Sequence, residues 1–133
     1  MGLDCFQKVS LMPYAPVSLA RTFDLFSEQW QPKVVAEMND YQFKVVRIEG
    51  NFVWHSHADT DETFLVLDGA LRIDFRDGAV TLHAGDLFVV PKGKEHKPFA
   101  EREVKLLLME PRGVANTGDA QPSDRTAIND IWI

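Results

Sequence analysis

The chain has 133 residues, of which 45% are hydrophobic and 26% are charged, so it can form one compact domain with a continuous core but not two. Its net charge of −6 argues against nucleic acid or an anionic membrane surface as a partner, because both require a basic face. No stretch approaches the roughly 20 apolar residues that span a bilayer, and no export signal is recognisable. We therefore expect a cytoplasmic protein, in which the single Cys5 forms no internal disulfide.

One short amphipathic helix is predicted near the N-terminus, within residues 18–28. Leu19 and Phe23 occur there at helical spacing. Ser18 precedes them as a suitable N-cap, and Pro32 ends the pattern.

From residue 33 onward the sequence changes to short runs rich in Val, Ile, Leu and Phe, separated by turn sequences. The runs are 33–38, 41–48, 63–67, 70–75, 79–82, 87–90, 96–99 and 104–109. With no helix between them, parallel βαβ units are excluded, and seven or eight strands must form a sandwich or a barrel. Asp68-Gly69 and Asp77-Gly78 are each expected to form a hairpin with a type I′ turn.

The last part of the chain is polar and rich in Pro, Gly, Asn and Asp, which indicates a loop or a wrapping tail. Ile131 and Trp132 could dock this tail. We predict an N-terminal segment over 1–32, a barrel over 33–110 and a C-terminal tail over 111–133, all within one domain.

Two of the four histidines, His55 and His57, are separated by one residue. In a strand they would point to the same side, about 7 Å apart along the chain, which suits two ligands of one ion. Imidazole and carboxylate groups together bind divalent first-row metals. Glu62 begins the next predicted strand and His96 enters a later one, so both could complete the set. The remaining His83 precedes a turn and is expected to face solvent.

Residues 50–100 resemble the two sequence motifs of the cupin family. The first motif, G-x5-H-x-H-x3-4-E-x6-G, is matched by Gly50, His55, His57, Glu62 and Gly69, with one residue fewer after the first glycine. The second, G-x5-P-x-G-x2-H-x3-N, is matched by Gly85, Pro91, Gly93 and His96, with Ala100 in place of the final Asn. Neither departure removes a possible ligand.

The resemblance implies an all-β fold, a small antiparallel jelly-roll β-barrel, here with a short N-terminal helix. It implies that His55, His57, Glu62 and His96 hold a divalent metal ion such as Fe, Mn, Ni or Zn inside the barrel. A homodimer is implied too, and a long apolar edge strand would need covering by a partner. Trp30 or Trp132 could contribute to that interface.

Several neighbouring residues keep simpler interpretations. Asp59 and Asp61 are interpreted as solvated loop residues, although either could support a ligand histidine through its second ring nitrogen. Trp54 would face away from its histidine neighbours and pack on the wall. Arg47 points the same way as the histidines if the strand is unbroken, but a bulge near Gly50 would reverse it.

Two functions fit this site. The first is a metal-dependent enzyme on a small organic substrate inside the barrel, of the dioxygenase, isomerase or lyase class that the resemblance includes, and no catalytic residue beyond the metal ligands is identified. The second is a non-enzymatic, metal-stabilised module that binds a small molecule or sugar. The chain is also similar to small bacterial proteins described as mannose-6-phosphate isomerase-like. A sugar phosphate would need an anion site, however, and only Arg47, Arg72, Lys92 and Lys94 lie near the motifs.

Overall fold

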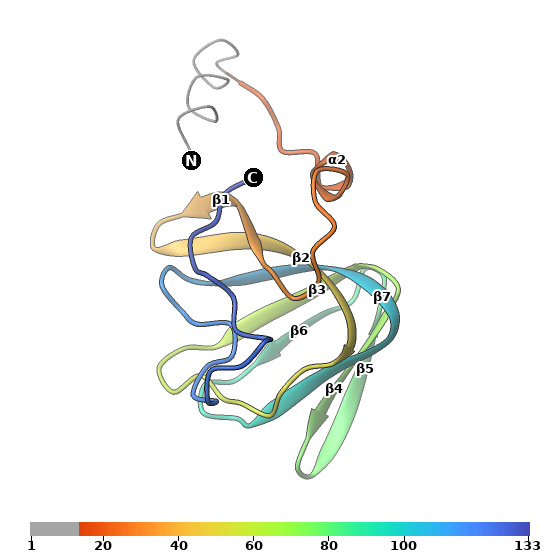
Figure 1. The fold of residues 1–133 in the computed structure, drawn as a ribbon, viewed down its shortest axis with the longest axis vertical. Helices are drawn as coiled ribbons and strands as arrows, with labels where there is room; N and C mark the ends of the chain where they lie inside the picture. The colour runs from red at the N-terminus through yellow and green to blue at the C-terminus, as the bar shows by residue number, and fades with distance from the viewer. Residues whose placement is uncertain (1–13) are drawn as a thin grey trace.

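The structure, a computed structural model, describes residues 14–133, so the expectation about Cys5 lies outside it. Its elements are α2 (Leu19–Phe23), β1 (Lys33–Met38), β2 (Tyr41–Asn51), β3 (Glu62–Asp68), β4 (Ala70–Phe75), β5 (Gly78–His83), β6 (Leu87–Val90) and β7 (His96–Pro111). Figure 1 shows the strands curving around one interior, with α2 beside the end of the barrel that carries β1. None of the helices in this part of the chain is long and apolar enough to cross a membrane.

Helix α2 is shorter than the predicted 18–28. Ser18 caps it as expected, because its side chain accepts a hydrogen bond from the backbone N–H of Arg21. At the end of the helix the guanidinium of Arg47 donates hydrogen bonds to two backbone carbonyls, to Phe23 O at 2.6 Å and to Phe26 O at 3.0 Å. A side chain from the barrel thus satisfies carbonyls near the end of the helix, which ends after five residues.

The long strand β7 organises the barrel. It pairs antiparallel with β2 over residues 99–111, with β3 over residues 105–109 and with β4 over residues 96–99. The sheet order is β1-β2-β7-β3-β6, with β5 added to β4. The predicted runs 96–99 and 104–109 are therefore one strand. The small antiparallel jelly-roll barrel with a short helix is confirmed.

One of the two predicted hairpins is wrong, and neither turn is type I′. Strands β3 and β4 do not pair with each other, and both run along β7 instead. Gly69 between them approaches the backbone of β7 so closely that an added Cβ would lie 3.0 Å from Glu103 O. Asp77-Gly78 does connect the β4–β5 hairpin. A type I′ turn needs two consecutive positive φ angles, and of these four turn residues only Gly69 has one.

A bulge in β2 settles which side chains face the interior. The register with β7 shifts between Ile48 and Gly50, and Gly50 has φ +84°. Arg47 lies on the outer face, where its ion pair with Glu103 on β7 is 2.7 Å long. It is therefore not part of the histidine site.

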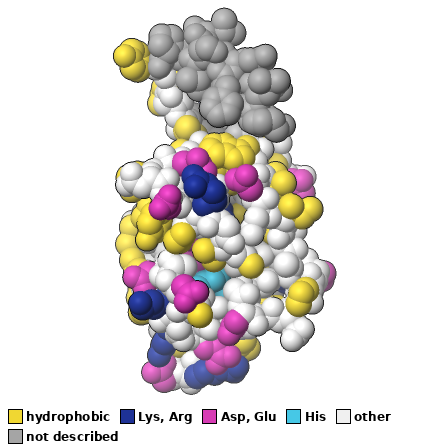
Figure 2. Space-filling view, turned by 90° about the vertical axis from the view of Figure 1, so that its left-hand side faces the viewer, with side chains coloured by type: hydrophobic (Ala, Val, Ile, Leu, Met, Phe, Trp, Pro, Cys, Tyr) yellow, Lys and Arg dark blue, Asp and Glu magenta, His cyan; other side chains and the backbone are white. Residues whose placement is uncertain are grey.

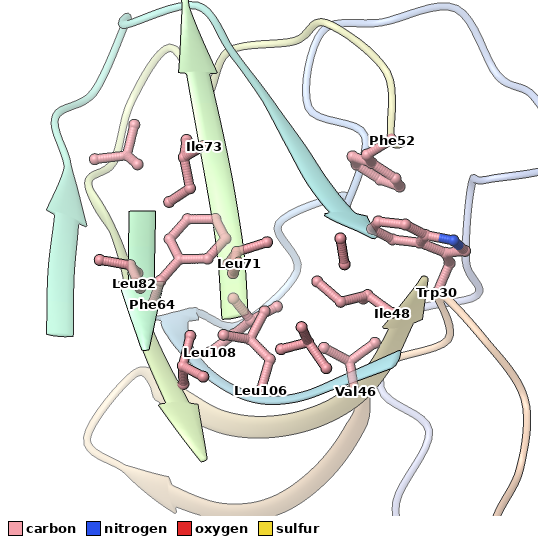
Figure 3. Packing of buried hydrophobic residues seen from close by; sticks show 14 residues of the cluster. Trp30, Val46, Ile48, Phe52, Phe64, Leu71, Ile73, Leu82, Leu106 and Leu108 are labelled. Atoms are coloured by element: carbon pink, nitrogen blue, oxygen red, sulfur yellow. The ribbon is translucent and has the colours of Figure 1, made fainter. Parts of the chain in front are cut away.

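The core is one cluster between the strands, seen in Figure 3. Phe64, Val66 and Ile73, from the apolar runs of β3 and β4, are buried in it. Trp30 stacks on Phe52 with ring centroids 4.7 Å apart and is only 5% exposed, so Trp30 is part of this chain's own core and leaves little surface for a subunit interface.

The C-terminal residues return to the first strand. Val34 donates its backbone N–H to Ile131 O at 2.7 Å, and Ile133 donates to Val34 O at 3.2 Å. Figure 1 shows this last segment running along the barrel to end near β1. The tail's own backbone therefore covers part of the β1 edge.

Candidate metal centre

His55 and His96 are joined through their backbones. Each donates its N–H to the carbonyl of the other, at 3.0 and 2.9 Å, although His55 lies in an irregular segment and not in the strand that we predicted. His57 O accepts a hydrogen bond from Gly93 N at 2.7 Å, which ties the His-x-His segment to the turn before β7. Backbone hydrogen bonds therefore position the two residues, His55 through His96 and His57 through Gly93, in place of the regular alternation of a strand.

The structure brings His55, His57, Glu62 and His96 together, as the spacing predicted. One possible ligand atom from each residue lies within 4.8 Å of all the others. Glu62 Oε1 is 3.3 Å from His57 Nε2 and 3.5 Å from His96 Nε2. All four residues are buried. These separations are of the size expected when ligands at roughly 2.0–2.2 Å surround one ion.

Backbone carbonyls orient two of the imidazoles. His55 Nδ1 lies 2.9 Å from Val53 O, and His96 Nδ1 lies 2.9 Å from Lys94 O. A carbonyl only accepts, so each Nδ1 carries the hydrogen in these contacts. In the neutral imidazole with this tautomer Nε2 is the atom that can bind a metal, which is the arrangement usual for ligand histidines.

The atoms that face one another in the cluster lack hydrogen-bond partners. Within residues 14–133, His57 Nε2, His96 Nε2 and Glu62 Oε1 are buried with no such bond. Buried polar atoms without partners are costly, at roughly 1–3 kcal/mol each. A metal ion bound between them would satisfy all three, so the residues fit a divalent cation.

Burial and neighbouring groups set the protonation of the cluster. Burial lowers the pKa of His55 to about 4, and the nearby His96 adds to this effect. Burial alone would raise the pKa of Glu62, but polar contacts with His57, His96 and Glu110 outweigh it and hold that pKa well below its ordinary range. At neutral pH the site therefore offers a neutral His55 and an ionised Glu62, the forms in which both bind metals.

The lowered pKa of His55 predicts a pH dependence of the metal-free protein. Between pH 6.5 and about 4 the unfolded chain binds a proton on His55 that the folded chain does not bind. The contribution of a neutral His55 to the free energy of unfolding is therefore fully present above pH 6.5 and is lost as the pH falls toward 4. We expect wild type to lose on the order of 3 kcal/mol more than His55→Gln over this window. Urea unfolding with a chelator measures it, and parallel curves for the two proteins would contradict it.

Two hollows meet at the cluster. An inner cavity of about 40 Å³ is lined mainly by apolar side chains, and both His55 and Glu62 reach it. An outer groove of about 340 Å³, which includes His57 and Asp59, lies between residues 56–60 and 113–119. Histidine atoms are visible from outside, in cyan, in Figure 2. His57 lines the outer groove, so the cluster borders that groove.

The other singled-out residues serve the surrounding structure. Asp61 Oδ1 accepts a hydrogen bond from Lys92 N at 2.8 Å and so fixes the turn that leads to His96. Trp54 packs under the guanidinium of Arg76, 3.7 Å from the ring centroid. His83 is exposed, as predicted.

The sequence interpretation missed a buried ion pair near the cluster. Lys44 Nζ lies 2.8 Å from Glu110 Oε2, and their side chains are 4% and 1% exposed. Burial raises the pKa of Glu110 well above its ordinary value, and the adjacent charge of Glu62 adds to this. The sequence did indicate the burial of Glu110, because Glu110 follows Leu106 and Leu108 at every second position of β7 and so points to the same side.

Residues 113–120 of the tail are attached to the His-x-His segment. Asp119 accepts from Ser56 N at 2.8 Å and from Ser56 Oγ at 3.0 Å, and it donates its own N–H to Ser56 O at 3.1 Å. Gly118 has φ +54°, and an added Cβ would clash with the carbonyl of Ser56. The tail therefore forms one wall of the outer groove.

Substitution of Gly118 with alanine tests this attachment. We expect a loss of roughly 1–3 kcal/mol of stability, because the left-handed backbone and the close carbonyl both oppose a Cβ. Gly113→Ala is the matched control, since Gly113 also has a positive φ, +86°, but nothing within 4 Å of an added Cβ. Calorimetry measures both, and equal losses would contradict the close contact at Gly118.

Comparison with known proteins agrees with the fold and the motifs. The cupin domain family model matches residues 44–110. The YdbB protein of Bacillus subtilis (strain 168) is 41% identical over 64 residues, which cover 47% of this chain and 57% of YdbB. The chain thus matches less than two thirds of that relative's length.

Two solved structures are similar over most of their length. A cupin-2 domain containing protein from Shewanella frigidimarina NCIMB 400 is 56% identical with a TM-score of 0.72, and the match covers 72% of this chain and 94% of that one. The protein NMB1881 from Neisseria meningitidis is 31% identical with a TM-score of 0.67, over 73% of this chain and 99% of that one.

Proposed function

The chain belongs to the cupin domain family, and we propose that it is a metal-dependent enzyme acting on a small, weakly charged organic molecule. His55, His57, Glu62 and His96 would hold a divalent ion such as Fe, Mn, Ni or Zn. When bound, the ion would polarise a substrate oxygen or support oxidation by dioxygen. The three buried, unpartnered atoms of His57, Glu62 and His96 carry this proposal.

The linings of the two hollows indicate the substrate class. Among residues 14–133, neither lining contains Lys or Arg, so no cationic side chain there would bind the phosphate of a sugar phosphate. The inner cavity has room for on the order of two or three water-sized groups, so the larger part of a substrate would lie in the outer groove. A sugar phosphate is therefore a poor candidate.

The available side chains also bear on the reaction class. Apart from His55 and Glu62, the inner cavity contains no acid or base from the described residues. Of the two carboxylates in the outer groove, Asp119 is hydrogen-bonded to Ser56 and Asp59 is exposed to solvent. Isomerases and lyases usually need a protein group that moves a proton. An oxidation by dioxygen relies less on such a group, so within the enzyme class we favour an oxygenase.

The same lining favours the alternative function, a metal-stabilised binding module, because binding needs no acid or base at all. An enzyme would turn over its ligand, whereas a binding module would return it unchanged. An acid or base beyond the metal ligands would favour an enzyme over a binding module. None is found among the described residues that line the inner cavity.

Metal analysis with oxygen uptake tests the proposal. We expect the protein purified with and without air to carry near-stoichiometric metal, and the iron-loaded form to consume dioxygen with a panel of small aromatic and enol compounds. Zn, Mn or Ni without oxygen consumption, but with a converted substrate, would assign an isomerase or lyase instead. Ligand binding without conversion would assign the binding module.

A homodimer is also proposed. Strand β6 is an edge of the sheet and exposes Leu87 and Val89, which are 59% and 43% accessible. Burying an apolar edge against a second copy would remove both from water. Sedimentation at micromolar concentration should give twice the monomer mass for wild type and less association for Leu87→Glu, and a wild-type monomer would contradict the proposal.

A further inference from the structure

Three buried ionisable side chains lie in a row across neighbouring strands. Thr63 of β3 pairs with Met109 of β7, which places Glu62 opposite Glu110. Both side chains are buried, and their carboxyl groups are in contact. One of these two carboxylates is a member of the metal cluster, and the other is not.

Lys44 completes the row from strand β2. Gln42 pairs with Glu110, and Lys44 pairs with Leu108, so Lys44 is diagonal to Glu110 on the inward face. Its Nζ is 2.8 Å from Glu110 Oε2. The other oxygen, Glu110 Oε1, is buried without a hydrogen-bond partner among the described residues.

A buried ion pair is a poor way to stabilise a barrel. Removing each charge from water costs several kcal/mol, and hydrophobic pairs of similar volume are often as stable or more so. Neither Lys44 nor Glu110 lines the inner cavity or the outer groove, so neither is placed to touch a substrate. What remains to explain the pair is the contact of Glu110 with Glu62.

We propose that Glu110 is a positioning residue for Glu62, and that Lys44 holds Glu110 in the position that this role needs. Lys44 Nζ lies 2.8 Å from Glu110 Oε2 and so fixes the Glu110 carboxyl group in place. The fixed Glu110 side chain then limits the movement of its cross-strand neighbour Glu62. This inference rests on the proposed metal site and adds two residues on which metal affinity depends without their being ligands.

The test is titration of chelator-treated full-length protein with Co²⁺, followed by its visible absorption. Glu110→Gln keeps the shape of the side chain but replaces the carboxyl group that contacts Lys44 and Glu62 by an amide. We expect it to weaken Co²⁺ binding by about 10–100-fold, the usual effect of removing support from a ligand. Lys44→Met should weaken binding as well, because it acts through Glu110. At saturation the absorption bands of Glu110→Gln should stay where they are in wild type, since the ligands are unchanged.

Arg47→Met is the matched control. Arg47 forms an ion pair between the same two strands, with Glu103, but on the outer face. It should change stability and leave Co²⁺ affinity unchanged. Circular dichroism in chelator establishes that each variant is folded, and Lys44→Met provides a second measurement if Glu110→Gln does not fold.

Combination with Glu62→Gln separates positioning from general damage. If Glu110 acts through Glu62, Glu110→Gln should have little further effect in a Glu62→Gln background. An equal loss in both backgrounds, unchanged affinity of the single variants, or shifted absorption bands would overturn the inference. Unchanged affinity in Glu62→Gln and His57→Ala would instead overturn the metal site itself, so the two failures are distinguishable.

Discussion

Replacing Glu62 with glutamine is expected to weaken divalent metal binding by more than about 100-fold, beyond the effect of losing a supporting residue. The amide keeps the shape of the side chain but removes the one negative charge that the cluster offers the ion. In wild type, Co²⁺ at 100 times its dissociation constant should stabilise the folded protein by about 2.7 kcal/mol. At the same concentration Glu62→Gln should gain less than about 0.5 kcal/mol.

The control for this experiment is His83→Ala. His83 is exposed and lies outside the cluster, so its removal should leave metal binding and metal-induced stabilisation unchanged. His57→Ala should behave like Glu62→Gln, because His57 Nε2 is one of the buried atoms without a partner. Metal-induced stabilisation equal to wild type in both variants would contradict the site.

Local sequence patterns predicted the strands well but not how they pair. The alternation of apolar residues located nearly every strand, because one face of each is buried. Pairing depends on contacts between distant segments, and here β7 draws both β3 and β4 to itself. Asp68-Gly69 therefore connects two strands that both pair with β7, and it does not form the predicted hairpin.

The site was predictable to the extent that motif spacing specifies it. His55, His57, Glu62 and His96 come together as the spacing indicated, although His55 and His57 lie on an irregular segment that strand periodicity does not describe. The outer groove was not predictable, because it depends on Asp119 returning to Ser56 from 63 residues away. Lys44 and Glu110 were missed because a charged residue in a strand is ordinarily exposed.

Replacing Lys44 with methionine is expected to lower the free energy of unfolding by roughly 3–5 kcal/mol, the usual loss when one partner of a buried ion pair is removed. Glu110 would remain buried beside Glu62 without its cation. Urea unfolding at pH 7 in the presence of chelator measures the loss apart from any metal effect. The control is Lys94→Met, which removes a lysine from the exposed ion pair with Asp77 and should lower the free energy of unfolding much less.

The double variant Lys44→Met/Glu110→Leu separates what the pair does for the fold from what it does for the site. Because both charges are gone, most of the lost stability should return, as it does when buried pairs are replaced by apolar residues. Metal affinity should not return, since Glu62 would still lack its neighbour. Recovery of both would mean that the pair only fills space, whereas a Lys44→Met protein as stable as Lys94→Met would mean that water reaches Glu110. A double variant that is stable but binds metal poorly would show that the barrel does not need Lys44 and Glu110 for its stability, whereas the metal site does.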